Sequence, residues 1–134
     1  MDLVLDLNVI ITIGKGVNPK NCKDEKPLRI MRDTISCSHT LHITKQIYIE
    51  YSKKFDELEG SFQINAPGLI AKAMESNKIR WESDITPQSL PNDCQASDED
   101  KKFVELAFAT DSILVTYDGG LTENCKFAKR PDEL

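Results

Sequence analysis

The sequence predicts a three-layer α/β/α sandwich with a mainly parallel central sheet, as a single domain over residues 1–134. Short, fully apolar runs typical of buried strands alternate along the chain with longer stretches whose apolar residues recur at helical spacing. The 134 residues are enough for one buried core, and 40% hydrophobic with 29% charged residues is ordinary globular composition. We find no internal repeat or low-complexity segment.

A buried strand is predicted at the start of the chain. Residues 3–6 form an apolar run that ends in an aspartate and is followed by further β-branched residues, which is typical of a strand covered on both faces. Glycine, asparagine and proline between residues 14 and 19 then mark a loop. A helix is expected from near Pro27 to about Cys37, because proline suits the first helical turn.

The middle of the chain predicts two strands and two helices. Residues 41–43 indicate a short strand, and Thr44 can cap the helix that follows, which Gly60 ends. A further helix is expected to begin near Pro67. Residues 79–82 then indicate a third strand, followed by a loop that contains proline and asparagine and runs through Gln95.

The last third of the chain predicts one helix and two strands. Ser97 opens a helix with apolar residues at helical spacing. Residues 112–116 form another apolar strand, which leads directly into an aspartate and two glycines. An edge strand is expected around Phe127. This alternation of strands and helices is what predicts a parallel sheet.

Charge and the N-terminal segment limit the partners. The chain has 17 Lys and Arg against 22 Asp and Glu, a net charge of −5. This balance does not indicate a polybasic surface that binds nucleic acid. The acidic excess is either a solvated surface or a set of carboxylates that holds a cation. The chain opens without the basic start and long apolar stretch of a signal peptide, so we expect a cytoplasmic protein with no membrane partner.

The four cysteines are scattered and form no Cys-x-x-Cys pair, which argues against a structural zinc site. They are Cys22, Cys37, Cys94 and Cys125. Two histidines, His39 and His42, lie near one of them and leave a mixed metal site open. In a reducing compartment we expect four unpaired thiols.

Aspartates follow the two strands that the sequence predicts best. Asp6 follows the first strand and Asp118 follows the strand at 112–116. Ligands of open parallel sheets bind beyond the carboxyl ends of the strands, so both acids would face one crevice if these strands are neighbours. Each one alone is also an ordinary turn residue after a strand.

Three more acids lie on predicted helices. Glu50 lies at the margin of the apolar stripe of its helix, where it either joins the crevice or pairs with Lys53 or Lys54. Asp98 and Asp100 lie in the first turn after Ser97, a position that helix capping alone would explain. Carboxylates gathered in one crevice repel one another unless a hard cation neutralises them. Mg²⁺ or Mn²⁺ takes such oxygen ligands and suits phosphodiester hydrolysis.

Four segments, in order and spacing, resemble the motifs of PIN-domain nucleases over nearly the whole chain. Asp6-Leu7-Asn8 resembles the opening motif, with leucine where threonine is common. Glu50 falls at the mid-chain helical glutamate, and Asp100 matches the acid of the third motif. The closing motif is similar to Thr116-Tyr117-Asp118, in which a threonine precedes the last acid by two.

The resemblance implies a divalent-metal-dependent endoribonuclease, as in the toxins of toxin–antitoxin pairs and in RNA-processing enzymes. The resemblance implies four catalytic and metal-binding acids: Asp6, Glu50, Asp100 and Asp118. Asn8 and Thr116 would orient them by hydrogen bonds, and Asp98 would be a further acid of the site. The expected cofactor is Mg²⁺ or Mn²⁺, and the expected partners are RNA, an antitoxin protein or a second copy of the chain. Gly119 and Gly120 replace the acid that often follows the closing aspartate, which leaves the number of metal ions open.

Two alternatives stay open. A haloacid-dehalogenase-like phosphatase also places an aspartate after its first strand, but it needs a second acid as proton donor where this chain has Asn8. A non-catalytic RNA-binding or scaffolding domain with the same fold would need local basic patches. The lysines that could supply them are Lys15, Lys20, Lys23, Lys26, Lys53, Lys54, Lys101 and Lys102, each of which could equally be an ordinary solvated lysine.

Overall fold

The structure is a computed structural model that describes residues 1–36, 38–83, 90–91 and 94–134. Its five strands are β1 (Asp2–Leu5), β2 (Thr40–Thr44), β3 (Ile79–Glu82), β4 (Ile113–Val115) and β5 (Ala128–Lys129). Its helices are α1 (Leu7–Lys15), α2 (Lys26–Ile35), α3 (Lys45–Glu57), α4 (Ala66–Glu75), α5 (Asp98–Ala109) and α6 (Gly119–Asn124), with short 3₁₀ turns at Glu59–Ser61 and Pro131–Glu133. The thiol of Cys37 and most of the loop expected before Gln95 lie outside the described residues.

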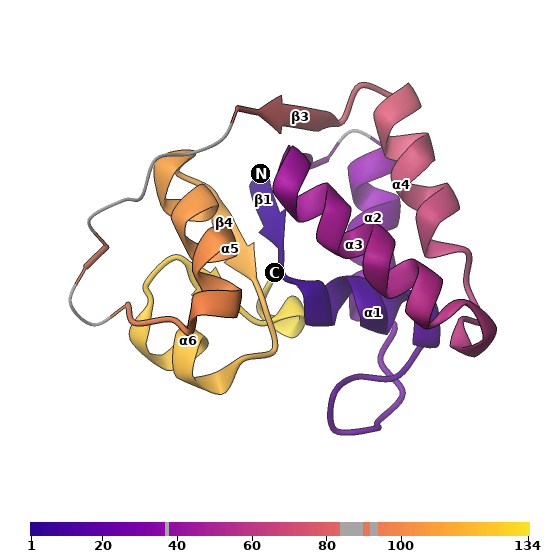
Figure 1. Cartoon of the computed structure of the whole chain (residues 1–134), viewed down its shortest axis with the longest axis horizontal. Helices are drawn as coiled ribbons and strands as arrows, with labels where there is room; N and C mark the ends of the chain where they lie inside the picture. The colour runs from indigo at the N-terminus through magenta and orange to yellow at the C-terminus, as the bar shows by residue number, and fades with distance from the viewer. Residues whose placement is uncertain (37, 84–89, 92–93) are drawn as a thin grey trace.

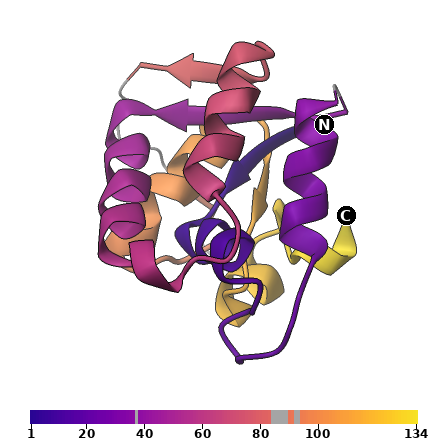
Figure 2. The same ribbon diagram turned by 90° about the vertical axis from the view of Figure 1, so that its right-hand side faces the viewer.

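All five strands form one parallel sheet in the order β3-β2-β1-β4-β5. Helices α1 to α4 pack together on one face, while α5 lies on the other face against β1, β2 and β4 (Figure 1). Figure 2 shows the strands stacked from β3 through β2 and β1 to β4 between the helices. The expected three-layer α/β/α architecture with a parallel sheet is therefore confirmed.

The core lies on both faces of the central strands. Leu3 and Val4 of β1 and Leu114 and Val115 of β4 are fully buried, as a strand covered by helices on both sides requires. Helix α5 adds Phe103 to this core, and its ring stacks on that of Tyr51 from α3 with centroids 6.3 Å apart. The two helix layers therefore touch beyond the end of the sheet, where Tyr51 donates a hydrogen bond to the backbone carbonyl of Leu5.

Helix α1 is the largest departure from the sequence-based expectation. The apolar residues after Asp6 continue as a helix rather than as part of a strand, because the Asp6 carboxylate accepts a hydrogen bond from the Leu7 N–H and caps that helix. Gly14 lies inside α1, not in a loop, and a Cβ there would lie 2.6 Å from the Phe62 ring. The helix ends at Gly16, whose φ of 77° is left-handed.

The other boundaries mostly follow the predicted signals. Thr44 caps α3 and Ser97 caps α5, each through its hydroxyl oxygen. The helix expected to reach Cys37 ends at Ile35. Helix α6 was not predicted, because two glycines open it, and the Asp118 carboxylate caps it. No helix in the described part of the chain is long and apolar enough to cross a membrane.

Candidate functional site

Asp6 and Asp118 lie at the same edge of the sheet because their strands are neighbours. Leu5, the last residue of β1, pairs in register with Val115, the last residue of β4. The chain therefore brings Asp6 beside Thr116, whose hydroxyl donates a hydrogen bond of 2.7 Å to Asp6 Oδ2. The same hydroxyl accepts a hydrogen bond of 3.0 Å from the backbone N–H of Asp118. Thr116 thus ties the two acidic strand ends together.

Asp6 is an unusually buried carboxylate. It is 3% exposed, and its other oxygen, Oδ1, accepts the Leu7 N–H at 2.7 Å. Burial raises the pKa of Asp6 to about 6, although the Thr116 hydrogen bond opposes the rise, and the negative charges of Asp100 and Asp118 add to it. The carboxylates of Asp100 and Asp118 are therefore close enough to disfavour the charged form of Asp6.

Helix α5 places Asp100 at this edge. A helix that returns between parallel strands runs against them, so its first turn lies at their carboxyl ends. Asp100 also caps its own helix with Ser97: its N–H donates to the Ser97 Oγ, and its Oδ2 accepts from that hydroxyl at 3.1 Å. Asp100 therefore both caps α5 and lies close enough to Asp6 to affect its pKa.

Glu50 approaches from α3, on the second turn after β2. It lines a pocket of about 300 Å³ with Asp100, and other charged side chains of the two helices surround both acids. The lining residues are Leu7, Glu50, Lys53, Lys54, Glu57, Glu99, Asp100 and Phe103. Burial raises the pKa of Tyr51 well above its ordinary value, and the charges of both Asp6 and Glu50 add to the rise. Tyr51 thus lies near both of these acids.

Glu50 forms an ion pair with Lys102 of α5 rather than with Lys53 or Lys54. Lys54 pairs instead with Glu57 at 3.1 Å. From the sequence, Lys102 was only a candidate for a basic patch. Its pairing joins two helices 52 residues apart, and no local spacing in the sequence signals such a contact.

The remaining two predicted site residues, Asn8 and Asp98, make different contacts. Asn8 accepts a hydrogen bond of 3.3 Å from the backbone N–H of Tyr117, so it fixes the chain just before Asp118 rather than an acid directly. Asp98 lines a separate pocket with Thr44 and Lys101. The structure therefore brings together Asp6, Asp100 and Asp118, adds Glu50 from the facing helix, and leaves Asp98 apart.

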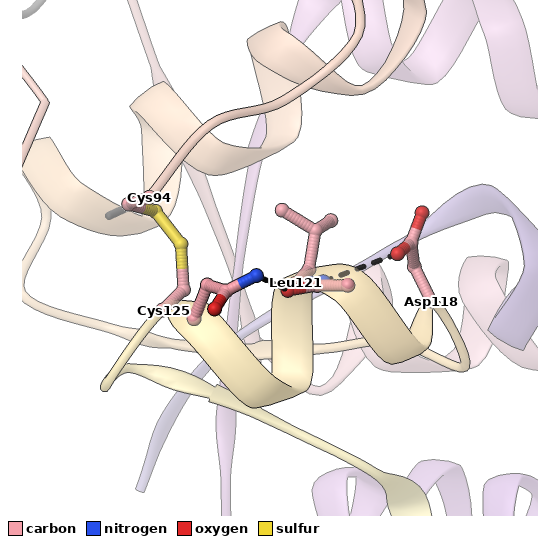
Figure 3. The surroundings of a disulfide bond; sticks show 6 residues. Cys94, Asp118, Leu121 and Cys125 are labelled. Atoms are coloured by element: carbon pink, nitrogen blue, oxygen red, sulfur yellow. Dashed lines mark hydrogen bonds between the residues drawn. A yellow bond between two sulfur atoms is a disulfide. The ribbon is translucent and has the colours of Figure 1, made fainter. Parts of the chain in front are cut away.

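The expectation of four unpaired thiols is wrong, because Cys94 and Cys125 form a disulfide with Cα atoms 4.6 Å apart. Both cysteines are buried, and the segment before α5 meets the end of α6 there. Figure 3 shows the disulfide at one end of α6 and Asp118 at the other. Scattered cysteines carry no spacing signal for such a bond, since only the fold brings them together. Cys22 is exposed and unpaired, as expected.

A hard cation fits the chemistry of these donors, since all of them are carboxylate oxygens and a positive charge would offset the repulsion that burdens Asp6. As the described side chains stand, no group of three or more His, Cys, Asp or Glu is placed to hold a metal ion. The carboxylate oxygens contact other protein groups instead. Asp6 accepts hydrogen bonds from Thr116 and Leu7, and Glu50 forms an ion pair with Lys102. A cation would therefore have to displace existing partners.

Within the part of the chain that the structure describes, the histidines form no metal centre either. His42 is buried on β2, where its Nδ1 lies 2.8 Å from Glu82 Oε1 and its Nε2 lies 3.3 Å from Asp2 Oδ1. These contacts tie three neighbouring strands at the side of the sheet. The mixed site with Cys37 lies outside the described residues.

Comparison of the chain with known protein families, with curated proteins and with solved structures finds no match in any of the three.

Proposed function

We propose that this chain is a divalent-metal-dependent endoribonuclease that hydrolyses RNA phosphodiester bonds, of the kind that its motifs resemble, the PIN-domain nucleases. The observation that carries the proposal is the state of Asp6. Its carboxylate is buried at the carboxyl end of β1, beside Asp100 and Asp118, with a pKa raised to about 6. Such a cluster costs stability without a counter-charge, which a bound cation would supply.

Each residue of the candidate site has a proposed role. Asp6, Asp100 and Asp118, with Glu50 after a side-chain rotation, would hold Mg²⁺ or Mn²⁺, and Thr116 would keep Asp6 oriented. When bound, a divalent cation makes water a stronger nucleophile at neutral pH and stabilises the charge that develops on the leaving oxygen. Lys53, on the wall of the same pocket, would attract a phosphate of the RNA.

RNA is the proposed substrate, the cytoplasm the proposed compartment, and an antitoxin protein or a second copy of the chain the proposed protein partner. A small neighbouring gene for a DNA-binding protein would support the antitoxin.

The deciding experiment is single-turnover cleavage of structured and unstructured RNAs with Mg²⁺ or Mn²⁺, against an EDTA blank. Asp118→Asn should abolish cleavage, since the amide lacks the charge that holds a cation. The fold should survive, because asparagine is also a good N-cap and can accept the Leu121 N–H. RNA binding should persist or strengthen, as one charge that repels phosphate is gone.

The matched control is Asp132→Asn, an exposed aspartate in the 3₁₀ turn Pro131–Glu133, which should cut like the parent. If the parent cuts no RNA in the panel but binds RNA without metal, the nuclease proposal fails. The non-catalytic RNA-binding domain then takes its place.

A further inference from the structure

The ion pair between Lys102 and Glu50 crosses the wall of the candidate site. The Lys102 ammonium of α5 contacts Glu50 Oε1 of α3, and the two side chains are only 19% and 30% exposed. Partial burial lowers the screening by water and salt, so this pair holds more firmly than a pair on the open surface. The contact places the positive charge of Lys102 against one of the candidate acids, Glu50.

This contact occupies a carboxylate oxygen that a cation would need. Before Glu50 can bind a metal ion, this oxygen must release the Lys102 ammonium. The free energy needed to separate the pair therefore weakens the binding of the cation. Once separated, the ammonium has another polar environment within reach, since Lys102 also lines the neighbouring pocket with Asp98 and Glu105. The Lys102 ammonium therefore keeps acidic neighbours after the cation has replaced it at Glu50.

We propose that Lys102 is a built-in counter-ion that competes with the divalent cation for Glu50 and so sets the cation affinity of the site. This inference rests on the proposed function, because it assigns a role to Lys102 toward the cation that the nuclease would use. Lys102 is a positioning residue here: it holds Glu50 away from the cation until the cation displaces it. Without Lys102, Glu50 is available at once.

The test is calorimetric titration of Mn²⁺ into the full-length, metal-stripped chain. Lys102→Met should bind Mn²⁺ at least about fivefold more tightly than the parent, the factor by which even a well-formed exposed pair changes an equilibrium. Lys101→Met removes the same charge from the adjacent, exposed lysine and should change the affinity by less than about twofold, since water and salt screen it. Lys102→Gln keeps a polar side chain and serves as a second variant.

A double-mutant cycle shows whether the effect passes through Glu50. In a Glu50→Gln background, Lys102→Met should no longer alter Mn²⁺ affinity, because the pair it would break is already gone. A Lys102→Met protein that binds Mn²⁺ as the parent does, or more weakly, overturns the competition while leaving the nuclease proposal standing. Absence of Mn²⁺ binding in parent and variants alike overturns both. Thermal melts of each variant confirm that it is folded.

Discussion

Asp6 shows how a single carboxyl group can oppose the stability of the fold that holds it. Its pKa is raised from 3.8 to about 6, first by burial and then by the charges of Asp100 and Asp118. A folded-state pKa above the unfolded value means that the carboxyl loses its proton more readily when the chain unfolds. Asp6 therefore favours the folded state at low pH and opposes it once both states are ionised.

The first prediction concerns the pH dependence of stability without metal. As pH rises from about 4 to about 6, ionisation of Asp6 should remove up to about 3 kcal/mol from the free energy of unfolding. Asp6→Asn should lack this loss and be the more stable protein at pH 7.5 in EDTA. Urea unfolding at pH 4.5 and 7.5 measures the difference between parent and variant. An identical pH dependence in both proteins would mean that Asp6 does not carry this penalty.

Residue types and spacing predicted the individual acids better than their partners. Thr116 precedes Asp118 by two residues, and both follow a strand that is apolar enough to be recognised, so their place at the sheet edge could be anticipated. The partner of Glu50 could not. Two lysines within one turn of it were the local candidates, but the packing of α3 against α5 beyond the sheet selects Lys102.

At the scale of elements, the Cys94–Cys125 disulfide joins the approach to α5 with the end of α6. These are the helices that begin with Asp100 in the first turn and with Asp118 as the cap. The bond thus holds together the supports of two of the candidate acids. Because both cysteines are buried, the bond is also part of the hydrophobic core.

The second prediction is that loss of this bond destabilises the fold. A bridge between residues 31 apart restricts the unfolded chain, and this loop length corresponds to about 3–4 kcal/mol. Cys125→Ser should lower the free energy of unfolding by about that amount, measured by urea unfolding without reductant. Cys22→Ser, at the exposed free thiol, is the control and should unfold like the parent. Equal stability of both variants would argue against a formed disulfide.

The type of an element could be predicted where the apolar periodicity was strong. The prediction failed where one residue is compatible with two local structures. An aspartate after a strand can close a turn or cap a helix, and the sequence alone does not separate the two. Asp6 and Asp118 both do the second, so α1 and α6 were missed. The helices that Thr44 and Ser97 cap were predicted, because the hydroxyl comes before a clear apolar stripe.

At the scale of the whole molecule, the proposed cation site would couple cation binding to folding. A ligand that binds only the folded chain stabilises it by about 2.7 kcal/mol at 100 times its dissociation constant. The third prediction is that Mg²⁺ or Mn²⁺ raises the melting temperature of the metal-stripped protein. The rise should shrink in Asp6→Asn and persist in Asp132→Asn. An unchanged rise in Asp6→Asn would remove Asp6 from the cation site.

The parallel sheet as a whole could be predicted, because strands that alternate with helices have few other ways to pair. The strand order adds what alternation does not give: β1 lies at the centre, between β2 and β4. That position is why Asp6 and Asp118 meet at one edge of the sheet. The disulfide and the pairing of α3 with α5 depend on this order and were out of reach for the sequence.

The hydrogen bond between Thr116 and Asp6 spans 110 residues, and this fixes when the site can form during synthesis. A nascent chain that has not yet released β4 from the ribosome has Asp6 without its threonine and without Asp118. Contacts so distant in sequence form late in vectorial folding. The cluster of acids is therefore absent throughout most of translation, so an unfinished chain lacks the site at which we propose that RNA is cut.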